Sequence, residues 1–190
     1  MRLLEVMVSV FSFFWVSSTF AGGDCNKNSV ITKDIFQCAD ASYKKIDKKL
    51  NEQYSMLIAD PKFLNRDLLL EGERAWIRYR DVYCANIYES IFPGEEAGIE
   101  KIACLTALTS SRLVELLYLD TGVSGDGFYS SLSVMSKISS MTREEIFSYI
   151  ESVEKYPEEL DYYKKNCELT SAIYAEEEKI CRVRMKFQAM

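Results

Sequence analysis

Histidine is absent from this chain of 190 residues. A Ser-His-Asp triad, a Cys-His dyad and an H-E-x-x-H zinc site all require it, so the sequence excludes these reactive centres. Two carboxylates can hydrolyse a glycoside without histidine, but no pair of acids stands apart from those expected at helix ends. We therefore predict that the protein is not an enzyme and that it uses no cofactor and no metal.

A C-x-x-C pair is also absent, which argues against a redox-active dithiol and against a zinc ribbon. The six cysteines are nevertheless even in number, and all of them follow residue 21. In an oxidising compartment such a set forms disulfides. The cysteines are Cys25, Cys38, Cys84, Cys104, Cys167 and Cys181.

Long apolar runs are scarce, and the first one, Val6–Val16, is shorter than the roughly 20 residues that a transmembrane helix needs. Arg2 precedes this run and small residues follow it up to Ala21, as in a secretory signal peptide covering residues 1–21. An uncleaved membrane anchor is the alternative. We predict export to the periplasm or the medium, with no membrane attachment after cleavage.

Basic residues are in the minority, because 23 lysines and arginines face 29 acidic residues, for a formal net charge of −6. An acidic exported protein is a poor candidate for binding nucleic acid or an anionic membrane surface. The charge favours a cationic protein partner instead. The sequence does not indicate an oligomeric state.

Strands with alternating polarity are absent, whereas apolar residues recur at helical spacing along most of the chain. Asp60-Pro61 and Pro93-Gly94 separate three long amphipathic helices, and such short connections predict antiparallel neighbours. Pro61 is expected to open the second of these helices. The expected helices span about 35–57, 62–91, 95–117, 142–156 and 157–187.

The predicted fold class is therefore all-α. Residues 22–120 are expected to form a small antiparallel helical bundle stabilised by disulfides. Residues 121–141 have the glycine- and serine-rich composition of a linker. Residues 142–190 are expected to form a C-terminal helical extension.

The positions of four of the cysteines relative to the expected helices predict how they pair. Cys84 lies roughly 11 Å before the turn between the second and third helices and Cys104 roughly 15 Å after it, so the two can face each other. Cys25 precedes the first helix and can fold back onto Cys38. Two disulfides, Cys84–Cys104 and Cys25–Cys38, are expected.

Cys167 and Cys181 remain and would pair by elimination, but the helix geometry argues against it. If residues 157–187 form one helix, the two cysteines lie roughly 21 Å apart, far beyond the reach of a disulfide. Either the helix breaks between them or they have other partners. In the same region, Glu176–Glu178 is expected to be a solvated helical face.

Residues 71–84 concentrate aromatic and arginine side chains. Trp76 and Tyr79 follow the helical period of the core stripe, and Arg80 is placed to stack on the indole of Trp76. Asp81 can pair with that arginine or with another. We interpret these four residues as a structural staple, and the alternative is that they form a partner-binding surface.

An ordered series of motifs runs through the first two thirds of the chain. In chain order they are Asp24-Cys25, Cys38-Ala39, Leu50-Asn51-x-x-Tyr54, Arg74-Ala75-Trp76-Ile77, Arg80-Asp81, Cys84, Cys104-Leu105 and Arg112-Leu113. Over about residues 24–119 this series resembles the lysozyme inhibitor LprI-like N-terminal domain family of bacterial envelope proteins. The resemblance implies an exported helical protein that binds a lysozyme. Because Asp24 precedes the first cysteine, surface anchoring through a lipid is not implied.

Pro93, Gly94, Glu95 and Glu96 form the expected turn between the second and third helices. Acids in a first helical turn complement the helix dipole, which is the structural explanation for the two glutamates. The alternative is that this acidic tip, held by a disulfide, binds the basic surface of a lysozyme at a low entropic cost.

The functional hypothesis is an exported, non-catalytic binding protein that occludes a lysozyme or a related cell-wall hydrolase. The alternative is a periplasmic structural or interaction module, or an immunity-type protein, that acts through its C-terminal helical half. Residues 128–190 have no counterpart in the family pattern, so the resemblance assigns them no role.

Overall fold

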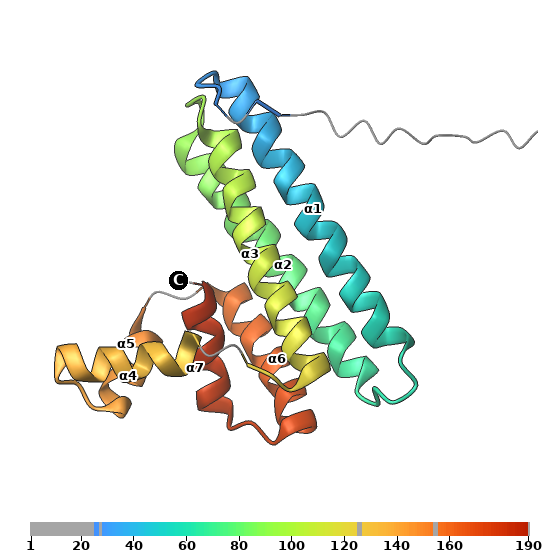
Figure 1. Ribbon diagram of the computed structural model, residues 1–190, viewed down its shortest axis with the longest axis vertical. Helices are drawn as coiled ribbons and strands as arrows, with labels where there is room; N and C mark the ends of the chain where they lie inside the picture. Colours follow the sequence, from blue (N-terminus) through green and yellow to red (C-terminus); the bar gives the residue numbers. More distant parts are fainter. Residues whose placement is uncertain (1–24, 27, 125–126, 154–155, 190) are drawn as a thin grey trace, which may run out of the picture.

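The computed structural model describes residues 25–189 except residues 27, 125–126 and 154–155, so the predicted signal peptide lies outside the described residues. Within this part of the chain the regular secondary structure is entirely helical, which confirms the all-α class. Figure 1 shows the longer helices side by side and the shorter ones gathered at one end. They are α1 (Thr32–Ala59), α2 (Arg66–Ile91), α3 (Ala97–Thr121), α4 (Gly127–Ser139), α5 (Arg143–Ser152), α6 (Pro157–Tyr174) and α7 (Glu178–Ala189).

Helix α3 lies between α1 and α2, and α6 packs on α2. The connection between α1 and α2 differs from the prediction, because Pro61 does not open the second helix. Instead, the backbone N–H of Lys62 donates to the carboxylate of Asp60 at 2.8 Å, and the N–H of Phe63 donates to the Asp60 carbonyl. This turn delays the start of α2 to Arg66.

The predicted hairpin between α2 and α3 is present, and the Cys84–Cys104 disulfide joins its two arms with a Cα–Cα distance of 5.6 Å. Helix α3 begins at Ala97, so Glu95 and Glu96 precede the helix rather than filling its first turn. The N–H of Gly94 donates to the carbonyl of Ile91 at 2.8 Å and closes the turn.

The predicted linker contains a helix that the composition did not suggest. Helix α4 occupies Gly127–Ser139 and buries Phe128 and Leu132. These side chains belong to a small apolar cluster shared by α4, α5 and α7. Burial of an apolar face against neighbouring helices outweighs the weak helix propensity of a serine-rich stretch.

The C-terminal helix predicted for residues 157–187 is in fact two helices. Helix α6 ends at Tyr174, Ala175 adopts a left-handed conformation with φ of 54°, and α7 begins at Glu178. The chain therefore reverses, and Cys167 and Cys181 form a disulfide with a Cα–Cα distance of 5.7 Å. Of the two alternatives left open, the helix break is confirmed, and the expected Cys25–Cys38 disulfide is present as well.

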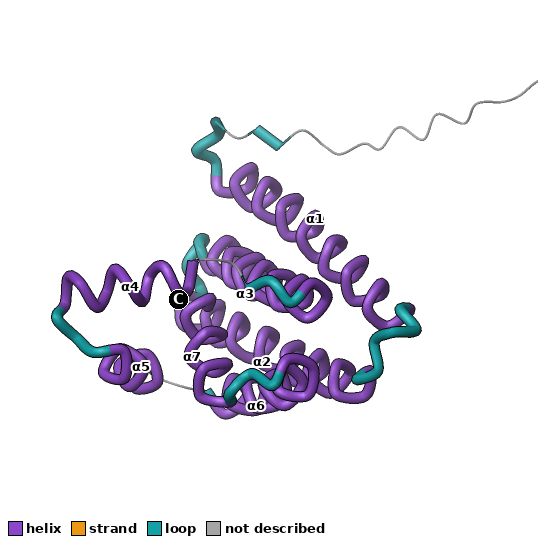
Figure 2. The backbone as a smooth tube through the Cα atoms, turned by 60° about the horizontal axis from the view of Figure 1, so that its bottom comes forward, coloured by secondary structure: helices purple, strands orange, loops and turns teal. Residues whose placement is uncertain are grey.

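The main apolar core is shared between the two halves of the chain. It combines Leu50, Trp76 and Leu116 from α1–α3 with Leu169 from α6 and Met185 from α7. Figure 2 shows α6 and α7 packed beside α2 and α3, whereas α4 and α5 lie to one side. Whether residues 22–120 fold as a separate domain stays a prediction, because α6 and α7 complete the core of that region.

Helix α3 is also long and apolar enough to cross a membrane by length and composition alone. The central helix of a water-soluble bundle passes the same test. Here α3 is packed between α1 and α2, and its Arg112 and Glu115 side chains are fully buried. The apolar character of α3 is therefore explained by its place at the centre of the bundle.

Candidate functional site

The aromatic–arginine motif on α2 is largely internal. The side chains of Trp76 and Tyr79 are only 2% and 4% exposed. The guanidinium of Arg80 lies over the indole of Trp76, 4.7 Å from the ring centroid, as the sequence predicts. Arg80 also pairs with Asp81 at 2.8 Å, and of these four residues Asp81 is the most exposed. The burial of Trp76 and Tyr79, and the stacking of Arg80 on Trp76, support the structural interpretation of the motif.

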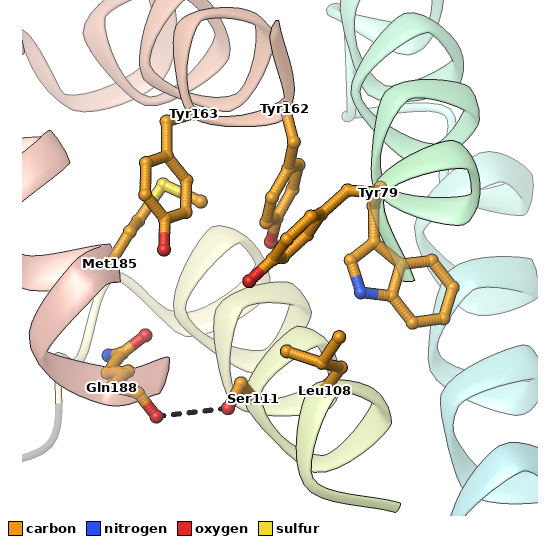
Figure 3. Close-up of a pocket in the computed structure, with 8 residues that line it drawn as sticks. Tyr79, Leu108, Ser111, Tyr162, Tyr163, Met185 and Gln188 are labelled. Atoms are coloured by element: carbon orange, nitrogen blue, oxygen red, sulfur yellow. Dashed lines mark hydrogen bonds between the residues drawn. The ribbon is translucent and has the colours of Figure 1, made fainter. Parts of the chain in front are cut away.

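A small crevice lies behind Trp76, and Figure 3 shows its lining. The rings of Tyr79 and Tyr162 stack there at 6.1 Å, and the Ser111 hydroxyl donates to the Gln188 carbonyl at 3.0 Å. The cavity measures only about 10 Å³, which leaves room for about one water molecule. The tyrosines therefore fill the space between α2, α3, α6 and α7, and the cavity beside them is too small to hold a ligand. Its lining residues are Trp76, Tyr79, Leu108, Ser111, Tyr162, Tyr163, Met185 and Gln188.

Tyr162 makes the stability of this cluster sensitive to alkaline pH. Burial raises the pKa of its hydroxyl to about 12, whereas an unfolded tyrosine ionises near 10. Because the folded pKa is the higher one, this contribution to stability is present below about pH 10 and is lost as pH rises towards 12. We expect the urea midpoint to fall between pH 9.5 and 11.5 and to fall less in Tyr162→Phe. Equal slopes in both proteins would contradict this assignment.

A network of buried charged and polar side chains joins α2, α3, α6 and α7, and the sequence did not predict it. Arg112 on α3 is central, since its Nε donates to Glu73 at 2.9 Å and its Nη1 to Asn166 at 2.6 Å. The amide of Asn166 in turn donates to Glu115 at 2.6 Å. The buried polar network consists of Glu73, Arg112, Glu115, Asn166, Glu176 and Arg184.

Arg184 completes the network from α7. Its guanidinium forms a two-pronged ion pair with Glu115 and donates to Glu176 at 2.9 Å. Burial alone would lower the pKa of Arg184, but the hydrogen bonds and charges of the two glutamates outweigh it and raise the pKa. Glu176 is thus a partly buried ion-pair partner, which corrects the expectation of a solvated face for that residue, whereas Glu177 and Glu178 are exposed as expected.

The network does not resemble a catalytic pair of acids. Each of its three carboxylates, on Glu73, Glu115 and Glu176, accepts a hydrogen bond from a guanidinium. Groups that are buried, paired and closed to solvent hold helices together and are poorly placed to exchange protons with a substrate. One signal in the sequence was available, because Arg112 lies four residues from both Leu108 and Leu116, on the buried stripe of α3.

A groove of about 370 Å³ runs between α1 and α2. Side chains of the family motifs line both of its walls, with Asn51 and Tyr54 on α1 and Arg74 and Ile77 on α2. The amide of Asn51 donates to the Asp47 carbonyl at 2.8 Å, so this wall is ordered by a local bond. The fold thus brings together motifs that are separated by about twenty residues.

The predicted acidic tip lies at the other end of the hairpin from the C-terminal helices (Figure 1). Pro93, Glu95 and Glu96 are exposed, and Gly94 lies within the turn. The Thr32 hydroxyl at the start of α1 donates to the Glu95 carboxylate at 3.4 Å. The tip residues are therefore distant from the motif around Trp76, and the structure does not bring the two candidate sites together.

Comparison with known proteins identifies the family. The sequence model of a family described as "Lysozyme inhibitor LprI" matches residues 25–116. An uncharacterized protein of Rhizobium meliloti (strain 1021), R02472, is 30% identical over 106 residues, which cover 49% of this chain and 76% of the relative. The chain belongs to the LprI family. No solved structure shows a significant match.

The LprI match ends within α3, yet the matched region depends on the residues beyond it. Arg112 lies inside the match, and its partner Asn166 lies outside it on α6. Glu115 also lies inside, and it is paired with Arg184 on α7. In this LprI protein the C-terminal helices therefore complete the packing and the ion pairing of the family region.

The three disulfides agree with an oxidising compartment. Two of them, Cys25–Cys38 and Cys84–Cys104, lie within the LprI match, and the third lies beyond it. Among the described residues, no group of three or more acids and cysteines is arranged to hold a metal ion.

Proposed function

We propose that this LprI-family protein is exported, binds a lysozyme or a related cell-wall hydrolase, and occludes that enzyme without catalysing a reaction itself. The observation that carries the proposal is membership of a family described as lysozyme inhibitors. The formal charge of −6 supports it, because an acidic protein is drawn to the basic surface of a lysozyme.

The tip formed by Pro93–Glu96 is the surface that we assign to this contact. Glu95 and Glu96 are exposed, and the turn that carries them is short and hydrogen bonded. The Cys84–Cys104 disulfide braces the two helices behind it. A braced loop loses little conformational freedom on binding, and exposed acids steer a cationic partner towards it.

Replacing both glutamates tests the role of the tip. Glu95→Gln/Glu96→Gln is expected to weaken binding to egg-white lysozyme about tenfold, because two exposed ion pairs at roughly 0.7 kcal/mol each amount to that factor. The loss should appear mainly in the association rate and should shrink at high salt. Surface plasmon resonance and a cell-wall lysis assay, repeated with lysozymes of other structural classes, measure these effects.

A second pair of adjacent acids supplies the matched control. Glu177→Gln/Glu178→Gln removes the same charge at the start of α7, at the opposite end of the molecule (Figure 1). This variant should bind as tightly as the unmodified protein. Equal weakening in both variants would show a general charge effect, and absence of both binding and inhibition for every lysozyme tested would refute the proposed function.

The second candidate function, an interaction module acting through the C-terminal half, has one observation in its favour. Helices α4 and α5 leave Tyr129, Val134, Ile138 and Tyr149 exposed. Removing residues 121–190 would not test this candidate cleanly, since α6 and α7 belong to the main core. A partner that tolerates Glu95→Gln/Glu96→Gln but is lost in Val134→Ser/Ile138→Ser would favour it.

A further inference from the structure

The first turns of α1 pack against the α2–α3 turn, which lies far along the chain. Besides the bond from Thr32 to Glu95, the ring of Phe36 lies so close to Gly98 that a Cβ there would approach it to 3.1 Å. The Cys25–Cys38 disulfide ties the segment before α1 to that helix. Figure 1 shows the two segments together at the end of the bundle, which we call the distal end (described residues 28–36 and 88–101).

The distal end exposes large apolar side chains from both segments. Val30 and Ile31 are 91% and 62% exposed, and Phe92 is 59% exposed. Ile35 and Phe36 are exposed to a lesser extent. None of these side chains belongs to either of the two apolar cores. Single exposed apolar residues are ordinary, but a group of five at one end of a molecule is typical of an interaction site.

The apolar group at the distal end lies among acidic side chains. The distal end carries five acidic side chains and only two basic ones, Lys33 and Lys101. Lys101 lies over the ring of Tyr88, at 5.6 Å from its centroid. The acids are Asp34, Glu89, Glu95, Glu96 and Glu100. An apolar group with an acidic surround matches the usual anatomy of an interface, in which a dry centre is enclosed by a polar rim.

We propose that the distal end is a single docking surface, in which Val30, Ile31 and Phe92 form the apolar centre and Glu95 and Glu96 form part of an acidic rim. Its partner is a protein that presents an apolar protrusion surrounded by lysine and arginine side chains. This inference rests on the proposed function and extends it, because it assigns the dominant contact to the segment before α1 rather than to the acidic tip.

Two disulfides make the surface rigid on both sides. Cys25–Cys38 holds the segment that carries Val30 and Ile31, and Cys84–Cys104 holds the hairpin that carries Phe92. The contacts of Thr32 and Phe36 then fix one segment relative to the other. Such a surface is ordered before the partner arrives, so little of the binding free energy is spent on ordering it.

Val30→Ser/Ile31→Ser tests the apolar centre with little risk to the fold. Both side chains point into solvent, and serine is a favoured residue at the position before a helix, where Ile31 lies. Binding to egg-white lysozyme, followed by surface plasmon resonance, is expected to weaken at least about tenfold, through faster dissociation. Glu95→Gln/Glu96→Gln should instead slow association.

The matched control is Val134→Ser/Ile138→Ser on α4, which removes two exposed apolar side chains elsewhere and should leave binding unchanged. Full binding by Val30→Ser/Ile31→Ser would overturn this inference and leave the proposed function intact. Absence of lysozyme binding by the unmodified protein would overturn both. The unmodified protein could instead associate with itself or bind anionic vesicles. If Val30→Ser/Ile31→Ser abolished either interaction, the surface would belong to another occupant, and the inference would be overturned.

Discussion

Arg184→Leu is expected to lower the free energy of unfolding by about 3–5 kcal/mol, since removing one partner of a buried ion pair leaves an uncompensated charge. Arg184 is fully buried and is the guanidinium partner of both Glu115 and Glu176. Without it, Glu115 keeps only the amide of Asn166. Chemical denaturation followed by circular dichroism measures the loss.

Arg182→Leu is the control for this prediction. It removes the same charge from the same helix, but its side chain is 37% exposed, its pair with Glu178 is exposed, and its pair with Glu151 is only partly buried. Such pairs contribute about 0–1 kcal/mol. If the two variants lost similar stability, the burial of the Arg184 pair would not be the cause of the effect.

A double variant separates loss of the pair from loss of packing. Glu115→Leu/Arg184→Leu replaces the buried pair by apolar groups, so it should be more stable than Arg184→Leu alone. The recovery should be partial, because Asn166 and Glu176 then lose partners as well. A double variant that is less stable than Arg184→Leu would mean that Glu115 stabilises the fold independently of the arginine.

Helical periodicity was sufficient to predict α1, α2 and α3, because each carries apolar residues at helical spacing. Those of α2 and α3 are buried along much of the helix, and those of α1 mainly in its second half. The same spacing placed Cys84 opposite Cys104. The helix boundaries were less accurate at the turns. At Asp60 and Gly94, local hydrogen bonds decide where the next helix begins, and they depend on backbone conformation rather than on composition.

The C-terminal half was harder to predict because tertiary contacts determine it. Neither glycine nor proline marks the break after Tyr174, where Ala175 takes a left-handed conformation that usually favours glycine. The break is stabilised from outside by the Cys167–Cys181 disulfide and by the ion pair between Glu176 and Arg184. A single sequence does not reveal such a long-range partner.

The candidate interaction surface was predicted only in part, for the same reason. The turn at Pro93–Glu96 lies between two clear helices, so its exposure followed from the helix prediction. The segment that carries Val30 and Ile31 has no periodicity, and its place beside that turn depends on contacts of Thr32 and Phe36 with residues more than sixty positions away. Only the folded chain joins the two.

Trp76→Ala is the variant that decides between a structural and a recognition role for the α2 motif. The indole is 2% exposed, lies under the Arg80 guanidinium, and belongs to the main core. Its removal leaves a large cavity, so the free energy of unfolding should fall by about 3–5 kcal/mol. Thermal and urea denaturation measure the change.

Ile77→Ala, at the next position on the same helix, is the control for Trp76→Ala. Its side chain is 39% exposed on the wall of the α1–α2 groove, so the loss of stability should be well under half of that for Trp76.

A Trp76→Ala protein that keeps full stability but no longer binds lysozyme would reverse the assignment. The α2 motif and the adjoining groove would then be the contact surface, and the distal end would lose its role. If both variants bind lysozyme normally at temperatures where they remain folded, the contact lies away from this groove, as the distal-end assignment requires.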